Sequence, residues 1–208
     1  LFKQCKGSDD DLHTLFQIMK KKGWSIRKAW EMLQNLSDAE IADMVIPVLY
    51  RPFDVRWIFY HDSLVWRTVK RIMGHMLAGN NIALIVQREH KDDFGAYITC
   101  CVGTHKTVAV YDINYYFPLY INNYDVFNRG LFSHLKPEKE KQLNLNPTII
   151  AALKEAYGQE PVPEDVFYYI YAVLYAETYR EKYIKLLKTD FPRIPFTNDF
   201  EIFQTLAT

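Results

Sequence analysis

The chain has 208 residues and a mass of 24.6 kDa, and 49% of its residues are hydrophobic. This apolar fraction excludes an intrinsically disordered protein, and only 8 glycines and 9 prolines exclude a collagen-like or linker sequence. Lysine plus arginine equals aspartate plus glutamate, at 25 each, so the net charge alone indicates no partner. No apolar run approaches the roughly 20 residues that span a membrane, and we expect no membrane partner.

Three cysteines, Cys5, Cys100 and Cys101, form no pattern with metal-ligand spacing. Adjacent cysteines rarely form a disulfide, so we expect free thiols in the reducing cytoplasm and no bound metal. The chain begins with Leu1 and shows no secretory signal pattern. We therefore expect a cytoplasmic segment of a longer polypeptide.

Capping signals divide the first 45 residues into helices. Ser8 precedes three acidic residues and an apolar run, Ser25 precedes a second run, and Ser37 with Glu40 matches a capping box. Pro47 ends this region. We expect residues 1–45 to form a helical connector and residues 46–208 to form the main domain.

Short β-favouring runs occupy the middle of the chain. The expected strands are Ile82–Gln87, Ala96–Val102, Thr107–Asp112 and Phe117–Ile121. The second and third runs lie four residues apart and are expected to form a hairpin. They predict one small sheet, mixed or antiparallel.

Helical signals return in the last third of the chain. Asn146-Pro147 starts one helix that ends at Gly158, and Pro163 starts a long one that runs to about Lys188. Tyrosines recur along it at positions 171, 175, 179 and 183. Such a row is typical of a core, although it also suits base stacking. The predicted class is α+β, with N-terminal helices, a small central sheet and a long Tyr-rich C-terminal helix.

Charge is unevenly distributed along the chain. No acidic residue occurs from Leu64 to Arg88. Arg67, Lys70 and Arg71 lie within five positions, and a helix there would place all three on one face. Such a cluster indicates phosphate binding or a solvated helix face.

The segment Tyr50–Tyr60 is too aromatic and too β-branched for a linker. Arg51 and Arg56 flank Pro52-Phe53-Asp54, and Asp54 can pair with one of the two arginines. Two interpretations remain open. The pair either lies inside the fold and pins a turn, or an arginine is presented to a phosphate or to a guanine edge.

Catalytic motifs are mostly absent from the sequence. It contains no phosphate-binding glycine loop, no G-x-S-x-G and no H-E-x-x-H pattern. Asp62, Glu89 and Lys91 match the acid, acid-x-Lys pattern of metal-dependent nucleases, in which two carboxylates hold Mg²⁺. A magnesium-dependent nuclease is therefore one alternative function, and a protein-interaction module that uses the aromatic surface is another.

Several motifs together resemble the C-terminal specificity domain of type ISP restriction–modification enzymes and of related adenine-specific DNA methyltransferases. They lie in the same order and spacing from about Tyr50 to the end, at Tyr50–Trp57, Phe117–Tyr120, Pro163–Ala172 and Asp190–Pro195. The resemblance implies a target-recognition domain at the end of a larger polypeptide. It also implies that residues 1–45 connect to an upstream N6-adenine methyltransferase domain.

The resemblance further implies sequence-specific binding of double-stranded DNA, with no catalytic residue in this segment. S-adenosylmethionine, ATP and Mg²⁺ are expected in the full-length enzyme, and no cofactor is expected here. Cationic side chains are expected on phosphates, namely Arg51, Arg56, Arg67, Lys70, Arg71 and Lys106. Amide and guanidinium side chains are expected to read bases, namely Asn80, Asn81, Gln87, Arg88, Asn114, Asn122, Asn123 and Arg129.

Overall fold

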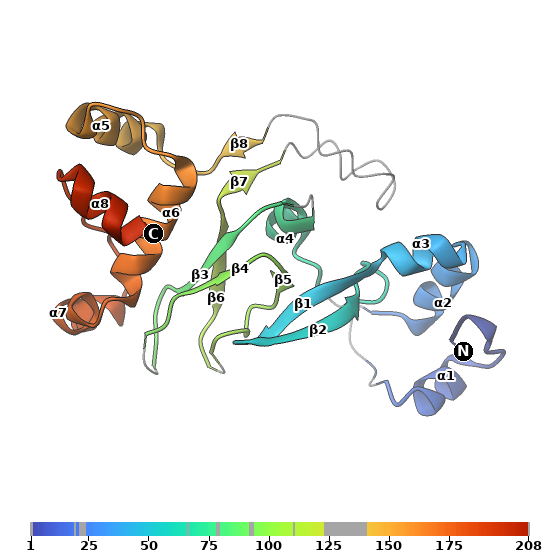
Figure 1. The fold of residues 1–208 in the computed structure, drawn as a ribbon. Coiled ribbons are helices and arrows are strands. Elements are labelled where there is room, and N and C mark those ends of the chain that lie inside the picture. The colour runs from blue at the N-terminus through green and yellow to red at the C-terminus, as the bar shows by residue number, and fades with distance from the viewer. Residues whose placement is uncertain are drawn as a thin grey trace.

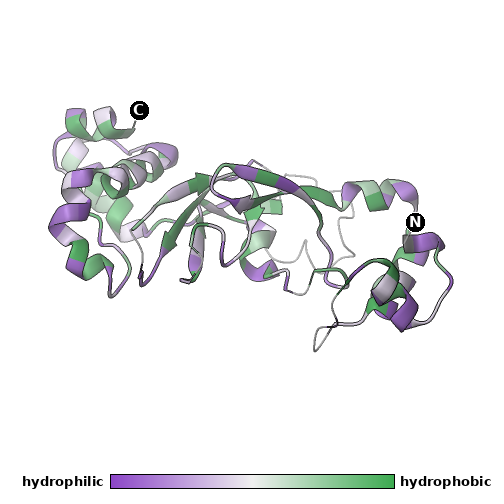
Figure 2. Ribbon diagram, turned by 90° about the horizontal axis from the view of Figure 1, so that it is seen from below, coloured by the Kyte–Doolittle hydropathy of each residue, from purple (hydrophilic) through white to green (hydrophobic). Residues whose placement is uncertain are grey.

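The computed structural model describes residues 2–18, 20, 24–65, 67–77, 80–91, 94–109, 111–122 and 141–207. Figure 1 shows helices at the N-terminal end, strands around one helix in the centre, and helices at the C-terminal end. Figure 2 shows these parts arranged along one long direction. The predicted α+β class is confirmed. None of the helices in the described ranges is long and apolar enough to cross a membrane.

The N-terminal helices begin at the predicted caps. The elements are the 3-10 turn η1 (Phe2–Gln4), α1 (Asp9–Leu15), α2 (Ile26–Gln34) and α3 (Asp38–Asp43). The side chains of Ser8 and Ser37 each accept a hydrogen bond from a first-turn amide, and in both cases an acidic side chain three residues later accepts one from the backbone amide of the serine. Ser25 caps α2 in the same way, without the return bond. These bonds satisfy helix amides that otherwise lack partners.

Two three-stranded sheets and a two-stranded ribbon form the centre. One sheet has the order β2-β1-β5, with β1 antiparallel to β2 and parallel to β5. The other has the antiparallel order β4-β3-β6, and β7 pairs with β8. The strands are β1 (Val45–Arg51), β2 (Asp54–Phe59), β3 (Ala83–Gln87), β4 (Tyr97–Thr99), β5 (Val102–Gly103), β6 (Asn114–Pro118), β7 (Tyr120–Ile121) and β8 (Gln142–Leu143).

The expected strand Thr107–Asp112, and the hairpin it was to form with Ala96–Val102, are wrong. In the described part of this run the chain bends and forms no strand, and β3 pairs instead with β4 and β6. The reason is Thr107, whose fully buried hydroxyl bonds to groups within its own loop as well as to other strands. Such local bonds compete with a ladder.

Strand β3 separates two hydrophobic cores. Ala83 and Ile85 face a core shared with β1 and helix α4 (Lys70–Leu77). Leu84 and Val86 face the opposite core, which is shared with the C-terminal helices. Because side chains alternate along a strand, the continuous apolar run of β3 is buried on both faces.

The predicted long C-terminal helix is two helices. Helix α6 (Pro163–Tyr175) ends at Ala176, whose ψ of 126° is extended, and α7 (Glu177–Leu187) follows directly. The break lets α7 leave the axis of α6, and the chain then returns to α8 (Phe200–Ala207). The predicted helix between Asn146 and Gly158 is confirmed as α5 (Pro147–Tyr157), with Gly158 in the left-handed conformation.

Tyrosines of these helices hold the segment that returns between α7 and α8. The hydroxyls of Tyr157, Tyr169 and Tyr179 donate to backbone carbonyls at residues 197, 195 and 193, at 2.8–2.9 Å. In the predicted row, the rings of 171 and 175 meet at 5.8 Å and those of 179 and 183 meet at 5.0 Å. Residue 175 is 62% exposed, whereas Tyr179 is buried. The row therefore belongs mainly to the core, as the pattern favours.

The buried phenol of Tyr116 predicts a loss of stability at high pH. Burial raises the pKa of Tyr116 to about 12, above the value of about 10 in an unfolded chain. Its contribution is complete below pH 10 and is lost as the pH rises toward 12, because only the unfolded state then loses its proton. The loss amounts to roughly 2–3 kcal/mol. Urea unfolding at pH 9 to 12 should show a steeper fall for the wild type than for Tyr116→Phe, and parallel curves would contradict this assignment.

Candidate nucleic-acid interface

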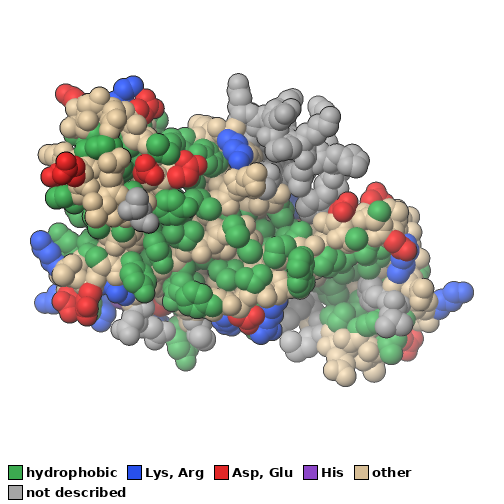
Figure 3. Space-filling view, viewed as in Figure 1, with side chains coloured by type: hydrophobic (Ala, Val, Ile, Leu, Met, Phe, Trp, Pro, Cys, Tyr) green, Lys and Arg blue, Asp and Glu red, His purple; other side chains and the backbone are tan. Residues whose placement is uncertain are grey.

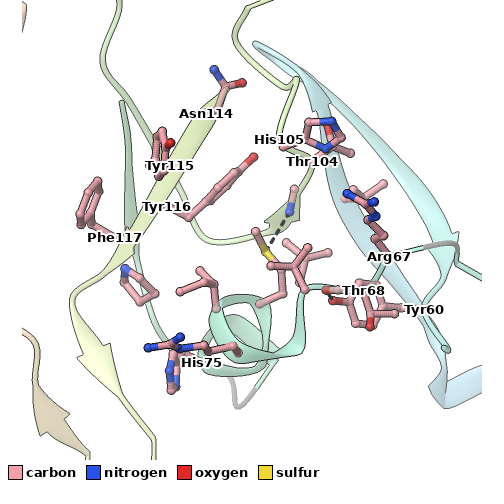
Figure 4. Close-up of a pocket in the computed structure, with 18 of the residues that line it drawn as sticks. Tyr60, Arg67, Thr68, His75, Thr104, His105, Asn114, Tyr115, Tyr116 and Phe117 are labelled. Atoms are coloured by element: carbon pink, nitrogen blue, oxygen red, sulfur yellow. Dashed lines mark hydrogen bonds between the residues drawn. The ribbon is translucent and has the colours of Figure 1, made fainter. Parts of the chain in front are cut away.

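A groove of about 830 Å³ lies between helix α4, strand β6 and the sheet that contains β1. Its walls are mainly apolar and aromatic, with Ile58, Ile72 and Tyr60 among them. Figure 4 shows Tyr116 pointing from β6 toward the loop that carries Thr104 and His105, and Tyr115 on the opposite side of the strand. The groove is thus built where the two sheets face each other across α4.

The groove carries positive charge and no negative charge among its described lining residues. Arg67 and Arg71 line it, and no aspartate or glutamate does. Burial lowers the pKa of His75, so this imidazole is neutral near pH 7, and its Nδ1 accepts a hydrogen bond from the amide of Asn122 at 3.1 Å. An acid-free surface with two guanidinium groups favours an anionic ligand.

The predicted cationic cluster is only partly assembled. Helix α4 begins at Lys70, so Arg67 precedes it, and Val69 has a left-handed φ of 46°. The segment is held by Thr68, whose carbonyl accepts from Tyr60 and whose hydroxyl donates to Asp62. The expected single helix face with all three cations is therefore wrong.

The ammonium of Lys70 forms an ion pair within the protein and is not left free for a phosphate. This ammonium bonds to the carboxylate of Asp62. Burial opposes ionisation of Asp62, but hydrogen bonds from Lys70 and Thr68 outweigh it and lower the pKa of that carboxyl. Because this pair is nearly neutral, Lys70 adds little net charge to the groove.

The β1–β2 hairpin places two more cations beside the groove. Ile58 lines the groove, and Arg56 lies two residues along β2, on the same face of the sheet. Both guanidinium groups of the hairpin lie over the ring of Tyr50, at 4.6 Å for Arg51 and 4.0 Å for Arg56. Stacking on a ring holds an arginine in place while its edge can still bond to a phosphate.

The pair that Asp54 makes lies on the surface, so the interpretation of an internal ion pair is wrong. The guanidinium of Arg56 donates hydrogen bonds to both carboxylate oxygens of Asp54 at 2.8–3.1 Å. This fork holds the pKa of Asp54 below its ordinary value. Both side chains remain well exposed, so the pair orients Arg56 more than it stabilises the fold.

The loop after β5 connects the hairpin to β6 through one hydroxyl. Thr107 Oγ1 accepts from the amide of Thr104 at 2.9 Å and from the hydroxyl of Tyr116 at 2.7 Å. It also faces the carbonyl of Leu49 at 3.2 Å. Arg51 donates to the carbonyl of Lys106 at 3.0 Å, and Lys106 Nζ donates to the carbonyl of Tyr111 at 2.7 Å. Lys106 therefore sits beside Arg51.

Removing the hydroxyl of Thr107 should loosen this loop. Thr107→Val keeps the shape of the side chain but leaves the Thr104 amide and the Tyr116 hydroxyl without their partner. Each orphaned buried group costs roughly 1–3 kcal/mol, so for the two groups together we expect a loss of at least about 2 kcal/mol in the free energy of unfolding. Thr104→Val keeps the Thr107 hydroxyl and should cost less. Equal stability of Thr107→Val and the wild type in urea would contradict the role of this hydroxyl.

Four expected base-reading residues are tied into the fold. Asn81 is 5% exposed, and its amide bonds to the backbone of His75, Ile82 and Tyr120. Gln87 and Asn114 are 2% and 4% exposed. Asn122 donates to the carbonyl of His75. Asn81, Gln87 and Asn114 are buried, although Asn114 lines the groove, and Asn122 is half-buried and bonded to His75. We therefore leave these four out of the proposed set of base-reading residues.

The remaining expected base readers are scattered. Arg88 pairs with Asp190 at 3.2 Å and lies 6.0 Å from the ring of Phe191, away from the groove lining. Asn80 is exposed, and its carbonyl accepts from Lys141. Asn123 and Arg129 lie outside the described residues.

The nuclease alternative receives no support from the described residues. Asp62 is engaged by Lys70 and Thr68, whereas Glu89 and Lys91 are exposed residues that follow β3. Among the described side chains, no group of three or more histidines, cysteines and carboxylates is arranged to hold a metal ion.

Several groove residues escaped the sequence analysis. His105 and Asn144 line the groove together with the aromatic residues of β6. The signal for β6 was its period of two, because Asn114, Tyr116 and Pro118 are buried while the residues between them are exposed. Figure 3 shows hydrophobic side chains gathered over the central strands and acidic ones over the terminal helices.

Comparison with known proteins gives one family. The sequence model of the Type ISP C-terminal specificity domain matches residues 3–208. None of the curated proteins matches the chain.

Three solved structures share the fold. The cryo-EM structure of a DrdV–DNA complex has a TM-score of 0.69 and 22% identity, covering 91% of this chain and 17% of that one. The ATP-dependent Type ISP restriction–modification enzyme LlaBIII bound to DNA has a TM-score of 0.60, 18% identity and coverage of 87% and 11%. A nuclease-deletion mutant of the Type ISP restriction–modification enzyme LlaGI in complex with a DNA substrate mimic has a TM-score of 0.56 and 18% identity, covering 88% of this chain and 15% of that one. The chain thus spans less than a fifth of each.

Proposed function

This chain belongs to the family of Type ISP C-terminal specificity domains, and from that premise we propose that it recognises a specific sequence of double-stranded DNA. One observation carries the proposal. Arg67 and Arg71 line a groove without carboxylates in its described lining, and Arg51 and Arg56 stand on the adjoining hairpin. Phosphate contacts of this kind set the register of a protein on a duplex.

The proposal includes a larger polypeptide around the chain. The structures that share its fold are of enzymes captured with DNA or a DNA mimic, and the chain spans only a small part of each. We propose that an N6-adenine methyltransferase domain lies upstream of this chain, and that the helices of residues 1–45 connect it to residues 46–208. That polypeptide would use S-adenosylmethionine, ATP and Mg²⁺ in the cytoplasm, while the present chain contributes recognition and no catalytic group.

Fluorescence anisotropy with labelled DNA tests the proposal. We expect the chain to bind duplexes at 50 mM salt. The logarithm of the affinity should fall linearly with the logarithm of the salt concentration, because lysine and arginine side chains that contact phosphates release the counterions condensed on the DNA. A single strand of the same sequence is the matched control and should bind more weakly. Failure to bind any duplex at 50 mM salt would contradict the proposed function.

An exposed apolar strip favours a second contact, with protein. Val55 and Trp57 are 54% and 73% exposed on the same face of β2. Large exposed apolar side chains in a row are typical of an interaction surface. We propose that this strip packs against the upstream domain. Trp57→Glu should then weaken binding of the chain to a separately produced methyltransferase portion without changing its affinity for DNA.

A further inference from the structure

The turn of the β1–β2 hairpin exposes an aromatic ring in a strained position. Pro52 and Phe53 connect the strands, and the backbone of Arg51 lies opposite that of Asp54 in the strand register. Phe53 is 95% exposed, the highest value among the described large hydrophobic residues, and its φ is 63°. Proline followed by a residue with positive φ is the pattern of a type II turn, in which glycine fits best. The chain therefore carries an unfavourable backbone and an unburied ring at one residue, neither of which helps folding.

The tip is held in place from its base. The guanidinium of Arg51 donates to the carbonyls of Tyr50 at 2.9 Å and Lys106 at 3.0 Å, which joins the hairpin to the next loop. Arg56 is fixed by its fork with Asp54. The ring of Phe53 meets that of Tyr97 only edge-on, with centroids 6.4 Å apart. A rigid support under an exposed ring suits insertion into a partner, because little order is lost on binding.

The charges around the tip indicate which partner the ring meets. Arg51 and Arg56 lie on the strands on either side of the turn, and Arg51 is bonded to the backbone of Lys106. Arg56 and Asp54 neutralise each other, so the net positive charge at the turn comes from Arg51. An apolar ring between cations matches a duplex, in which stacked bases lie between two lines of phosphates. A purely hydrophobic protein pocket would require these cations to lose water without a matching anion.

We propose that Phe53 inserts between two adjacent base pairs of the bound duplex and partly unstacks them. This inference rests on the proposed function, since it assumes that the chain binds double-stranded DNA. The ring supplies the wedge, while the arginines on both sides of the turn hold the flanking phosphates. Side chains such as phenylalanine act in this way at kinked base steps.

Phe53→Gly tests the wedge because glycine suits the turn better. The probe is a duplex enriched from a random pool by the wild-type chain, with 2-aminopurine placed at one position at a time. The wild type should raise 2-aminopurine fluorescence at one base step. Phe53→Gly should abolish that rise and weaken binding about tenfold, while its melting temperature stays the same or increases. Trp57→Ala removes another exposed aromatic residue and should leave the fluorescence rise intact.

The outcomes separate the wedge from the proposed function. If the wild type binds the duplex without any fluorescence rise, or if Phe53→Gly retains both the rise and the affinity, the wedge is overturned and DNA recognition stands. If Phe53→Gly instead melts at a lower temperature and loses binding only through unfolding, Phe53 is structural and the wedge is again overturned. If no duplex is enriched, the proposed function itself fails.

Discussion

Replacing Arg67 and Arg71 together by alanine is expected to weaken duplex binding about 60-fold at 0.1 M salt. Both side chains line a groove that has no carboxylate among its described lining residues. Each neutralised phosphate contributes about 0.9 to the steepness of log affinity against log salt. One such contact therefore raises the affinity about eightfold at 0.1 M salt relative to 1 M salt. The double substitution should therefore make the slope shallower by about two units, for specific and non-specific duplexes alike.

Lys70→Ala is the matched control for this measurement. Lys70 adjoins Arg71 in sequence, but its ammonium is paired with Asp62. We expect its salt slope to change by much less than one unit. A double variant of Arg67 and Arg71 with an unchanged slope would remove the groove from the DNA interface, and an equal effect of Lys70→Ala would show that its pair opens on binding.

Asn81→Ala is expected to destabilise the fold by about 3 kcal/mol without changing which DNA sequence is preferred. The amide makes four bonds to backbone groups, with Nδ2 donating to His75 and Tyr120 carbonyls at 2.9 and 2.8 Å, and Oδ1 accepting from two amides at 3.0 and 3.1 Å. Each buried group left without a partner costs roughly 1–3 kcal/mol, and water that enters the vacated space relieves part of this.

Asn80→Gly is the control for Asn81, because it changes the neighbouring exposed amide. Asn80 has a positive φ of 45°, which glycine adopts without strain. We expect a change below about 0.5 kcal/mol in urea unfolding. If Asn81→Ala were instead as stable as the wild type and altered sequence preference, Asn81 would belong to the base-reading surface after all.

The helical ends were predictable from the sequence because their bonds are local. The serine caps at 8, 25 and 37 and the Asn146-Pro147 start satisfy amides within one turn. The break at Ala176 was not predictable in this way, because both flanking segments have helical patterns. Tertiary bonds accompany it, among them the hydroxyl of Tyr179 on the carbonyl of Arg193. The prediction of a strand at Thr107–Asp112 was wrong for a similar reason, because β-favouring composition does not show that the Thr107 hydroxyl is buried and bonded within its loop.

The exposure of the cationic side chains was more predictable than that of the amides. Arginine is rarely buried without a partner, so Arg56, Arg67 and Arg71 remain at or beside the groove surface. Asparagine in a turn can satisfy backbone groups as readily as it reads a base, and Asn81 does the former. The pairing of Lys70 with Asp62, eight residues away, also needed the three-dimensional structure.

Whether the chain recognises a specific duplex sequence is tested by selecting duplexes from a random pool with the wild-type chain and sequencing the retained DNA. We expect enrichment of one short motif. Replacing Arg67 and Arg71 should weaken binding of that motif and of scrambled duplexes by similar factors. Retention of DNA without any enriched motif, or no retention at low salt, would contradict recognition of a specific duplex sequence by this chain.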